Sequence, residues 1–296
     1  MTTGDMHNST SSIVIILVIV AILVLIIGMV LGWQNHRAFI YNVAREIGKY
    51  GTLVQTYDMS YLKGEHFVVK YYPGDKNQAE LVLEAAEKFI NPVSQKLGYV
   101  PDKKVTVVVY PTREKLNSFF GWPANESAMG VYWAGTIRVL APREWVSADD
   151  ANDMREEFFK SGPMAHEIAH LAVDYRTKGN YTRWFTEGLA QYVELQLTGF
   201  RFNDPAGTLE KERYSIEQLT SQFDQLPNQS LAYRQSLATV YYLVDIYGEQ
   251  ILNEILNELN NGATMDQALQ HTCNVDLKIF EKQLNNWLDS NWSVLS

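Results

Sequence analysis

The sequence is poor in the residues that support several common protein classes. Its single cysteine, Cys273, excludes an internal disulfide and a metal site built from several thiolates. Basic residues are in deficit, with 25 Lys and Arg against 34 Asp and Glu, a net charge of -9 and a pI near 5.2. Without a basic stripe to neutralise phosphates, no nucleic acid partner is expected. Internal repeats and low-complexity linkers are also absent.

One long hydrophobic run is present at residues 13–31, where nineteen residues carry no charge. At about 1.5 Å per residue this run is long enough to span a bilayer core. A cleaved signal peptide is the competing interpretation. However, the run exceeds a usual signal core, the preceding tail contains Asp5 but no Lys or Arg, and no small-x-small cleavage site follows. We therefore expect a single-pass membrane protein with a tail at 1–12, an anchor at 13–32 and a juxtamembrane helical stalk at 33–60.

The orientation of this anchor is indicated by two conflicting signals. Arg37, Arg45 and Lys49 follow the run, and the positive-inside rule would keep that side in the cytoplasm. The family resemblance described below favours the outside. We favour a domain outside the cytoplasm.

The most informative motif is His166-Glu167-Ile168-Ala169-His170. Residues four apart lie on one face of an α-helix, so both imidazoles can reach one ion. Pro163 suits the first turn of such a helix, and we expect the helix to end before Gly179. A zinc ion with three protein ligands keeps a fourth position for water and lowers the pKa of that water to about 7. Glu167 is placed to accept its proton.

A third ligand is available in the next segment, where residues 184–190 read Trp-Phe-Thr-Glu-Gly-Leu-Ala. Glu187 would reach the ion if two antiparallel helices pack together. An isolated HExxH pattern also arises by chance in helices, but the second segment supplies what a two-His, one-Glu site requires. We predict one zinc per chain. Asp174 and Gln191, each one turn beyond a ligand, are candidates to hold a ligand imidazole by its second nitrogen.

These residues resemble the gluzincin metallopeptidases, and specifically the peptidase MA-like domains of bacterial proteins. The likeness continues in the strand-helix-strand pattern of residues 67–73, 79–97 and 104–111, and in the closing segments, so that it covers about residues 61–290. It implies that His166, His170 and Glu187 bind zinc, and that Glu167 is the general base for attack on a peptide carbonyl.

The sequence departs from this family in places. Gluzincins often carry a carboxylate one turn after the third ligand, where this chain has Gln191. The linker between His170 and Glu187 is slightly shorter than in the thermolysin-like and aminopeptidase N-type branches. The Gly-Ala-Met-Glu-Asn signature of the latter is absent, which favours an endopeptidase.

Two further features concern the substrate. Relatives stabilise the oxyanion with a Tyr or His from a later helix; Tyr233 is the first candidate and Tyr241 the second, although most of the 17 tyrosines will simply pack. Residues 129–133 and 136–140 read as a β-hairpin turned at Ala134-Gly135. Its first strand either pairs with an extended peptide or merely closes the sheet.

The predicted fold is α+β, with a small mixed sheet at 61–148, a helical half at 149–296 and the zinc site between them. We predict a membrane-anchored zinc metallopeptidase acting on peptides or proteins through a zinc-bound water. Two alternatives remain open: a zinc-binding domain that is catalytically silent or restricted to one partner, and a tethered interaction domain in which HExxH is accidental. The sequence indicates neither the oligomeric state nor the substrate side chains.

Overall fold

The computed structural model describes residues 20, 22–24, 36–123, 128–201, 209 and 212–291. The predicted anchor at 13–32 lies almost entirely outside these residues, as does the tail at 1–12. Within the described part of the chain, no helix is both long enough and apolar enough to cross a membrane.

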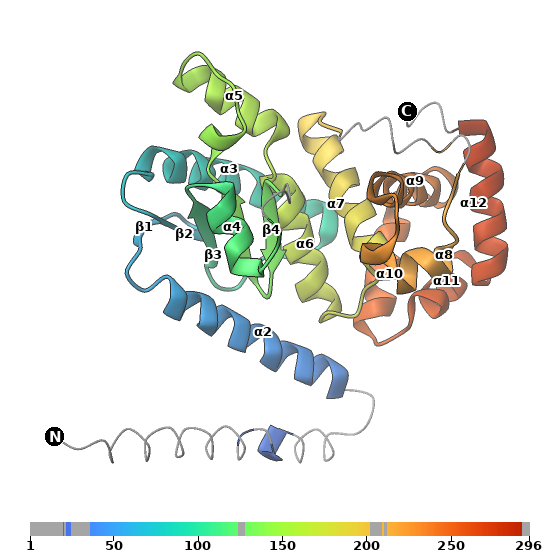
Figure 1. The fold of residues 1–296 in the computed structure, drawn as a ribbon. Helices are drawn as coiled ribbons and strands as arrows, with labels where there is room; N and C mark the ends of the chain where they lie inside the picture. The colour runs from blue at the N-terminus through green and yellow to red at the C-terminus, as the bar shows by residue number, and fades with distance from the viewer. Residues whose placement is uncertain are drawn as a thin grey trace.

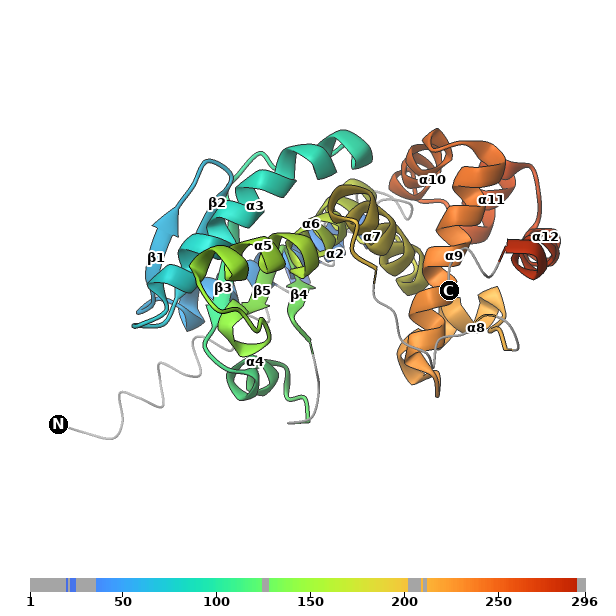
Figure 2. The same ribbon diagram turned by 90° about the horizontal axis from the view of Figure 1, so that it is seen from above.

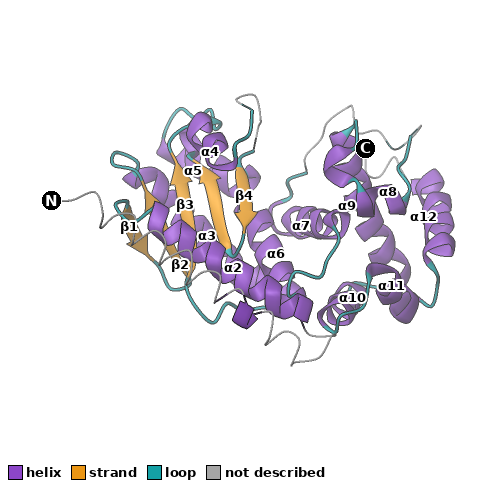
Figure 3. Ribbon diagram, turned by 60° about the horizontal axis from the view of Figure 1, so that its bottom comes forward, coloured by secondary structure: helices purple, strands orange, loops and turns teal. Residues whose placement is uncertain are grey.

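A five-stranded sheet forms the first half of the molecule, with strand order β1-β2-β3-β5-β4. The strands β2, β3 and β5 are parallel, and the edge strands β1 and β4 are antiparallel to their neighbours. Figure 3 shows the strands side by side. Their bounds are β1 Ser60–Lys63, β2 Phe67–Tyr71, β3 Val105–Tyr110, β4 Gly130–Trp133 and β5 Thr136–Leu140.

The burial pattern of the strands explains this order. Every residue of β5 and all but one of β3 are buried, as expected for central strands covered on both faces. Val107 and Val109 face the main core, whereas Val108 faces a smaller cluster with Leu116. The sheet is therefore packed on both sides.

Helices account for the rest of the chain (Figure 1). The helix α3 packs on the sheet and on α6, and α4 lies on the opposite face. The helices α6 and α7 pack against each other in the middle of the molecule, and α9 to α12 form the far end (Figure 2). The α-helices are α2 His36–Gln55, α3 Lys76–Leu97, α4 Arg113–Phe120, α5 Ala151–Ser161, α6 Met164–Thr177, α7 Arg183–Thr198, α8 Ile216–Ser221, α9 Gln229–Tyr247, α10 Gln250–Asn260, α11 Met265–Cys273 and α12 Leu277–Asn291; short 3-10 helices span η1 Pro142–Glu144 and η3 Phe223–Gln225.

The predicted α+β class is confirmed, with a mixed sheet followed by a largely helical half. The predicted hairpin is β4 and β5, and its two turn residues, Ala134 and Gly135, both have positive φ. Successive positive φ values are typical of the tight turns that match the twist of a hairpin. Cys273, the single cysteine, is free and buried.

The segment predicted as a juxtamembrane helix is helical over α2, but α2 does not stand away from the domain. Arg45 forms a buried ion pair with Asp174 of α6, with 2.9 Å between Nη1 and Oδ2. Tyr41 donates a hydrogen bond to the same carboxylate, and Arg138 of β5 donates to Thr52 at 2.9 Å. The inner face of α2 is therefore bonded to both the sheet and α6.

Candidate metal centre

The site begins with the local structure of α6. Pro163 is the N-cap residue, and the helix ends at Thr177, as the sequence predicted. His166 and His170 lie one turn apart on the same face, and their Nε2 atoms are 3.1 Å apart. The helical repeat alone produces this pair.

Tertiary packing brings Glu187 of α7 to the two histidines. Its Oε2 atom lies 3.4 Å from Nε2 of His166 and 3.5 Å from Nε2 of His170. Glu187 is 2% exposed and His170 is 8% exposed, so water contributes little to neutralising this cluster. The three side chains form the one His/Cys/Asp/Glu group in the described residues with ligand atoms close enough to share a metal.

The donor set and its spacing fit a zinc ion. Ligand atoms that lie about 2.0–2.1 Å from one tetrahedral zinc are about 3.3 Å from each other. The three separations here, 3.1, 3.4 and 3.5 Å, bracket that value. In addition, Oε2 of Glu187 is buried, and among the described residues it has no well-aligned hydrogen-bond donor, only the 3.4 and 3.5 Å contacts with the two imidazoles. A buried carboxylate oxygen without a donor is unfavourable unless a cation satisfies it.

Without a metal, the carboxylates around His166 favour the protonated form of its imidazole. Burial alone would lower the pKa of His166, but close contacts of the imidazole with the carboxylates of Glu187 and Glu194 raise it well above the usual value. Burial alone would raise the pKa of Glu187, but the charges of His170 and Arg183 and its histidine contacts bring it well below the usual value. Glu187 therefore stays ionised, which is the form that binds a metal.

Glu167, the predicted base, is buried next to the edge strand β4, beside Gly130 and Tyr132. It is 5% exposed, and its Oε2 atom has no hydrogen-bond partner. Burial raises the pKa of Glu167, although the neighbouring histidines and the backbone N–H of Tyr132 oppose that shift. A Cβ on Gly130 would lie 2.7 Å from Pro163 and 3.0 Å from Glu167. Glycine at this position is what lets β4 approach the start of α6.

The two residues predicted to support the ligand imidazoles do other work, so that prediction was wrong. Asp174 binds Tyr41, Arg45 and Tyr132. Gln191 donates through Nε2 to the backbone oxygens of Glu187 and Tyr233. Their spacing in the sequence suited the predicted role, but tertiary packing brings both side chains to other partners.

Thr186 and Glu194 support the imidazoles instead. Nδ1 of His170 lies 2.7 Å from Oγ1 of Thr186, and Nδ1 of His166 lies 3.3 Å from Oε2 of Glu194. Glu194 is seven residues beyond Glu187 and thus on the same face of α7, a signal that the sequence contained. It supplies the carboxylate that Gln191 lacks, one turn further on. Thr186 had no comparable signal, because only helix packing brings it to His170.

Tyr233, the first oxyanion candidate, lies beside this cluster on α9. Arg183, the residue one turn before Glu187, donates to Tyr233 Oη at 3.4 Å and contacts Oε1 of Glu187 at 3.0 Å. A Cβ on Gly188 would come within 2.3 Å of the Ser236 carbonyl oxygen, so this glycine permits the close contact of α7 with α9. Tyr241, the second candidate, stacks edge-on against Tyr192, with ring centroids 5.3 Å apart.

The fold and the cluster together define an α+β protein with a buried His-His-Glu centre built on an HExxH helix. The sequence profile of the peptidase MA superfamily matches residues 85–290, and the chain belongs to that superfamily. The resemblance predicted from the motifs is thereby confirmed. Members are typically metal-dependent, and membership supports a peptidase-like activity.

A curated relative is found in Bacillus subtilis (strain 168). This chain is 20% identical over 244 residues to the protein named "Uncharacterized protein YhcO", which covers 77% of this chain and 71% of the relative. The name states no activity.

Proposed function

We propose that this protein is a membrane-anchored zinc endopeptidase whose metal is held by His166, His170 and Glu187. The observation that carries the proposal is the buried triangle of two imidazole nitrogens and one carboxylate oxygen, spaced 3.1 to 3.5 Å apart. A zinc ion bound there would polarise the scissile carbonyl and make a water molecule more acidic. One zinc per chain is expected.

Glu167 is the proposed general base. Its carboxylate accepts a proton from the attacking water as the hydroxide oxygen bonds to the carbonyl carbon. The same carboxyl group then donates that proton to the amine as the carbon–nitrogen bond breaks. Burial, which raises the pKa of Glu167, suits a group that must both take and give a proton.

Tyr233 is the proposed donor to the oxyanion. Burial, foremost, and the Glu187 charge raise the pKa of Tyr233, so its hydroxyl keeps its proton at neutral pH and can donate. Arg183, which contacts both Tyr233 and Glu187, adds a positive charge at the same place. The Arg183 side chain is 46% exposed, so a substrate could reach it.

The edge strand β4 is the proposed substrate platform. It is last in the strand order, so along one edge its backbone groups have no strand partner among the described residues. An extended peptide added there would run beside Glu167, since the N–H of Tyr132 bonds to that carboxylate. Pairing along the length of a strand suits cleavage of internal bonds. The anchor at 13–32, proposed from its hydrophobic run, would keep the domain at a membrane, and which side it faces stays a prediction.

The test combines metal content with hydrolysis, using the detergent-solubilised full chain. About one zinc per chain is expected in the wild type and in Glu167→Gln, and none in His166→Ala after dialysis. His271→Ala is the matched control, because His271 is exposed and pairs only with Glu258 in the described contacts. Glu167→Gln should reduce cleavage of a peptide library by roughly 10²- to 10⁴-fold.

Each outcome separates one reading from the others. Zinc with no cleavage of any library peptide would point to a catalytically silent or partner-restricted domain. Absence of zinc in the wild type would leave a tethered interaction domain. Full activity in Glu167→Gln would overturn the proposed base.

A further inference from the structure

The helix α2 carries an apolar stripe on the side opposite its docked face. Its members are Ile40, Ile47, Tyr50 and Val54, separated by seven, three and four residues, which places them on one face of the helix. They are 45%, 67%, 70% and 53% exposed. We call these four residues the outer stripe. Such a run of exposed apolar side chains marks an interaction surface more often than a solvated face.

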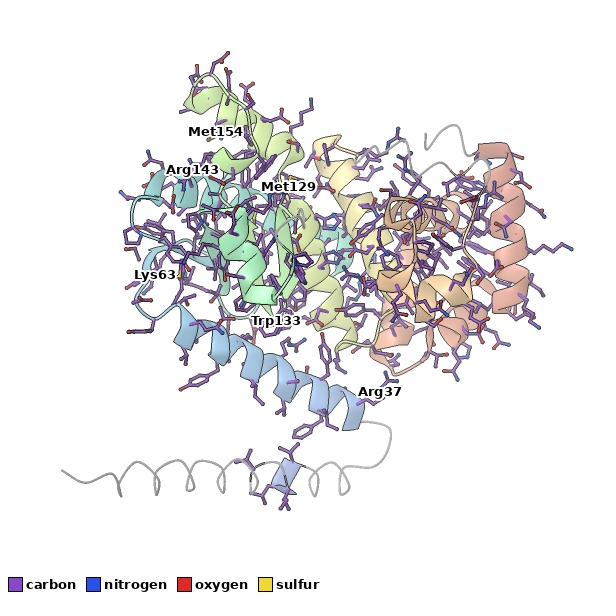
Figure 4. The ribbon with its side chains drawn as sticks, viewed as in Figure 1. Arg37, Lys63, Met129, Trp133, Arg143 and Met154 are labelled. Carbon is purple, nitrogen blue, oxygen red and sulfur yellow. The ribbon has the colours of Figure 1, made fainter. Side chains whose placement is uncertain are left out.

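The outer stripe cannot turn inward, because the opposite face of α2 is fixed. Arg45 and its partner Asp174 are 8% and 0% exposed, and Arg45 also lies over the Tyr175 ring at 3.8 Å. Rotating the helix would leave a buried aspartate without its cation, at considerable cost in free energy. Figure 4 shows α2 running beneath Trp133, with Arg37 near its first turn and side chains projecting from the face turned away from the sheet.

The neighbouring sequence indicates what covers the outer stripe. The hydrophobic run ends at residue 31 and α2 begins at His36. The five intervening steps of chain reach at most about 18 Å. A bilayer that holds the run therefore lies within that distance of the start of α2, and a 20-residue helix is about 30 Å long.

The side chains around the outer stripe also suit a bilayer surface. Tyr50 belongs to the stripe, and Tyr57 and Tyr61, which follow the helix in the sequence, are 82% and 55% exposed. Tyrosine is enriched where a membrane meets water, because its ring is apolar and its hydroxyl is polar. With a net charge of -9, the chain as a whole is repelled by anionic lipids, so apolar contact is the expected main force.

We propose that the outer stripe of α2 lies on the surface of the bilayer that holds residues 13–31. This inference rests on the anchor in the proposed function, but not on zinc or hydrolysis. The domain is then held against the membrane instead of on a free stalk. Since Arg45 ties α2 to α6, the helix that carries His166 and His170 has a fixed orientation relative to the bilayer. The substrates within reach are membrane-proximal segments of polypeptide.

Fluorescence quenching in phosphatidylcholine vesicles tests the contact. The full chain carries Cys273→Ser, which removes its only cysteine, and then Ile47→Cys or Val54→Cys labelled with a small fluorophore. Lys160→Cys is the control, since Lys160 is exposed on α5, on the opposite side of the molecule from α2 in Figure 1. Lipids with a nitroxide near the headgroup should extinguish much of the fluorescence at the two stripe positions and little at the control.

Flotation of the vesicles and zinc content are measured on the same samples. Equal quenching at all three positions in chains that float would overturn the contact while leaving the anchor in place. Bismaleimide cross-linking of Ile47→Cys into dimers, without lipid quenching, would assign the outer stripe to a second copy. Chains that do not float would overturn both the anchor and the contact, whereas zinc binding and hydrolysis report on the peptidase proposal separately.

Discussion

Two buried clusters, each of which includes one turn of α6, differ in how their carboxylates are hydrogen-bonded. Asp174 accepts hydrogen bonds from Tyr41, Arg45 and Tyr132, and both of its oxygens are used. Glu167 and Glu187 are similarly buried, but each retains an oxygen that has no hydrogen-bond partner among the residues that the structure describes. The first cluster is complete within the chain, so its role is to join α2, β4 and α6. The second is incomplete within the chain, which is typical of a site that binds something else.

The structural role of the Asp174 cluster is tested by Asp174→Ala, for which we expect the largest effect. The substitution leaves Arg45 as a buried cation without its partner, and should lower the free energy of unfolding by about 3–5 kcal/mol. Asp289→Ala is the matched control, because the Arg213–Asp289 pair is largely exposed on the aspartate side and should contribute about 0–1 kcal/mol. Urea titration of the solubilised chain measures both. A loss for Asp174→Ala no greater than that of the control would mean that the cluster does not join the elements.

A smaller effect is expected from Glu194→Gln. Glu194 orients the His166 imidazole through Nδ1, and loss of such a partner typically weakens metal binding by about 10- to 100-fold. Gln191→Leu removes the residue that the sequence suggested for this role and should leave zinc affinity unchanged, since its Nε2 donates to two backbone oxygens and no imidazole contact is found for it among the described residues. Competition with a chromophoric chelator gives both affinities. The assignment fails if the order of the two variants is reversed.

The smallest effect concerns pH. Close contacts with the carboxylates of Glu187 and Glu194 raise the pKa of His166 above its usual value despite burial, so the metal-free protein binds a proton that zinc must displace. Zinc affinity should therefore increase with pH, on the order of tenfold per unit below that raised pKa.

The stability of the metal-free protein should change with pH in the opposite direction and decrease as the pH rises. Because the pKa of His166 is higher in the folded than in the unfolded chain, protonation of His166 stabilises the folded state. This stabilisation is complete below the unfolded pKa near 6.5 and is lost as the pH rises through the folded pKa. Melting temperatures of the chelator-treated chain at several pH values measure this. Affinity that does not vary with pH would show that His166 is already neutral.

The sequence determined the parts of this protein that depend on local repeats. A helix with 3.6 residues per turn places His166 and His170 together wherever it lies, and alternating or continuous apolar residues marked the strands. Composition and the two motifs were sufficient for the α+β class and for the superfamily. They were also sufficient to nominate Glu187, because a glutamate followed by glycine in the helical segment after HExxH supplies what a two-His, one-Glu site requires.

Tertiary structure alone decided which neighbours complete each site. Asp174 has the correct spacing to back a ligand, yet Arg45, 129 residues earlier in the chain, takes its carboxylate. Thr186 reaches His170 only because α7 crosses α6 at that point. The docked position of α2 has the same origin. Contacts between distant segments depend on how helices pack in three dimensions, and spacing along the chain contains no record of that packing.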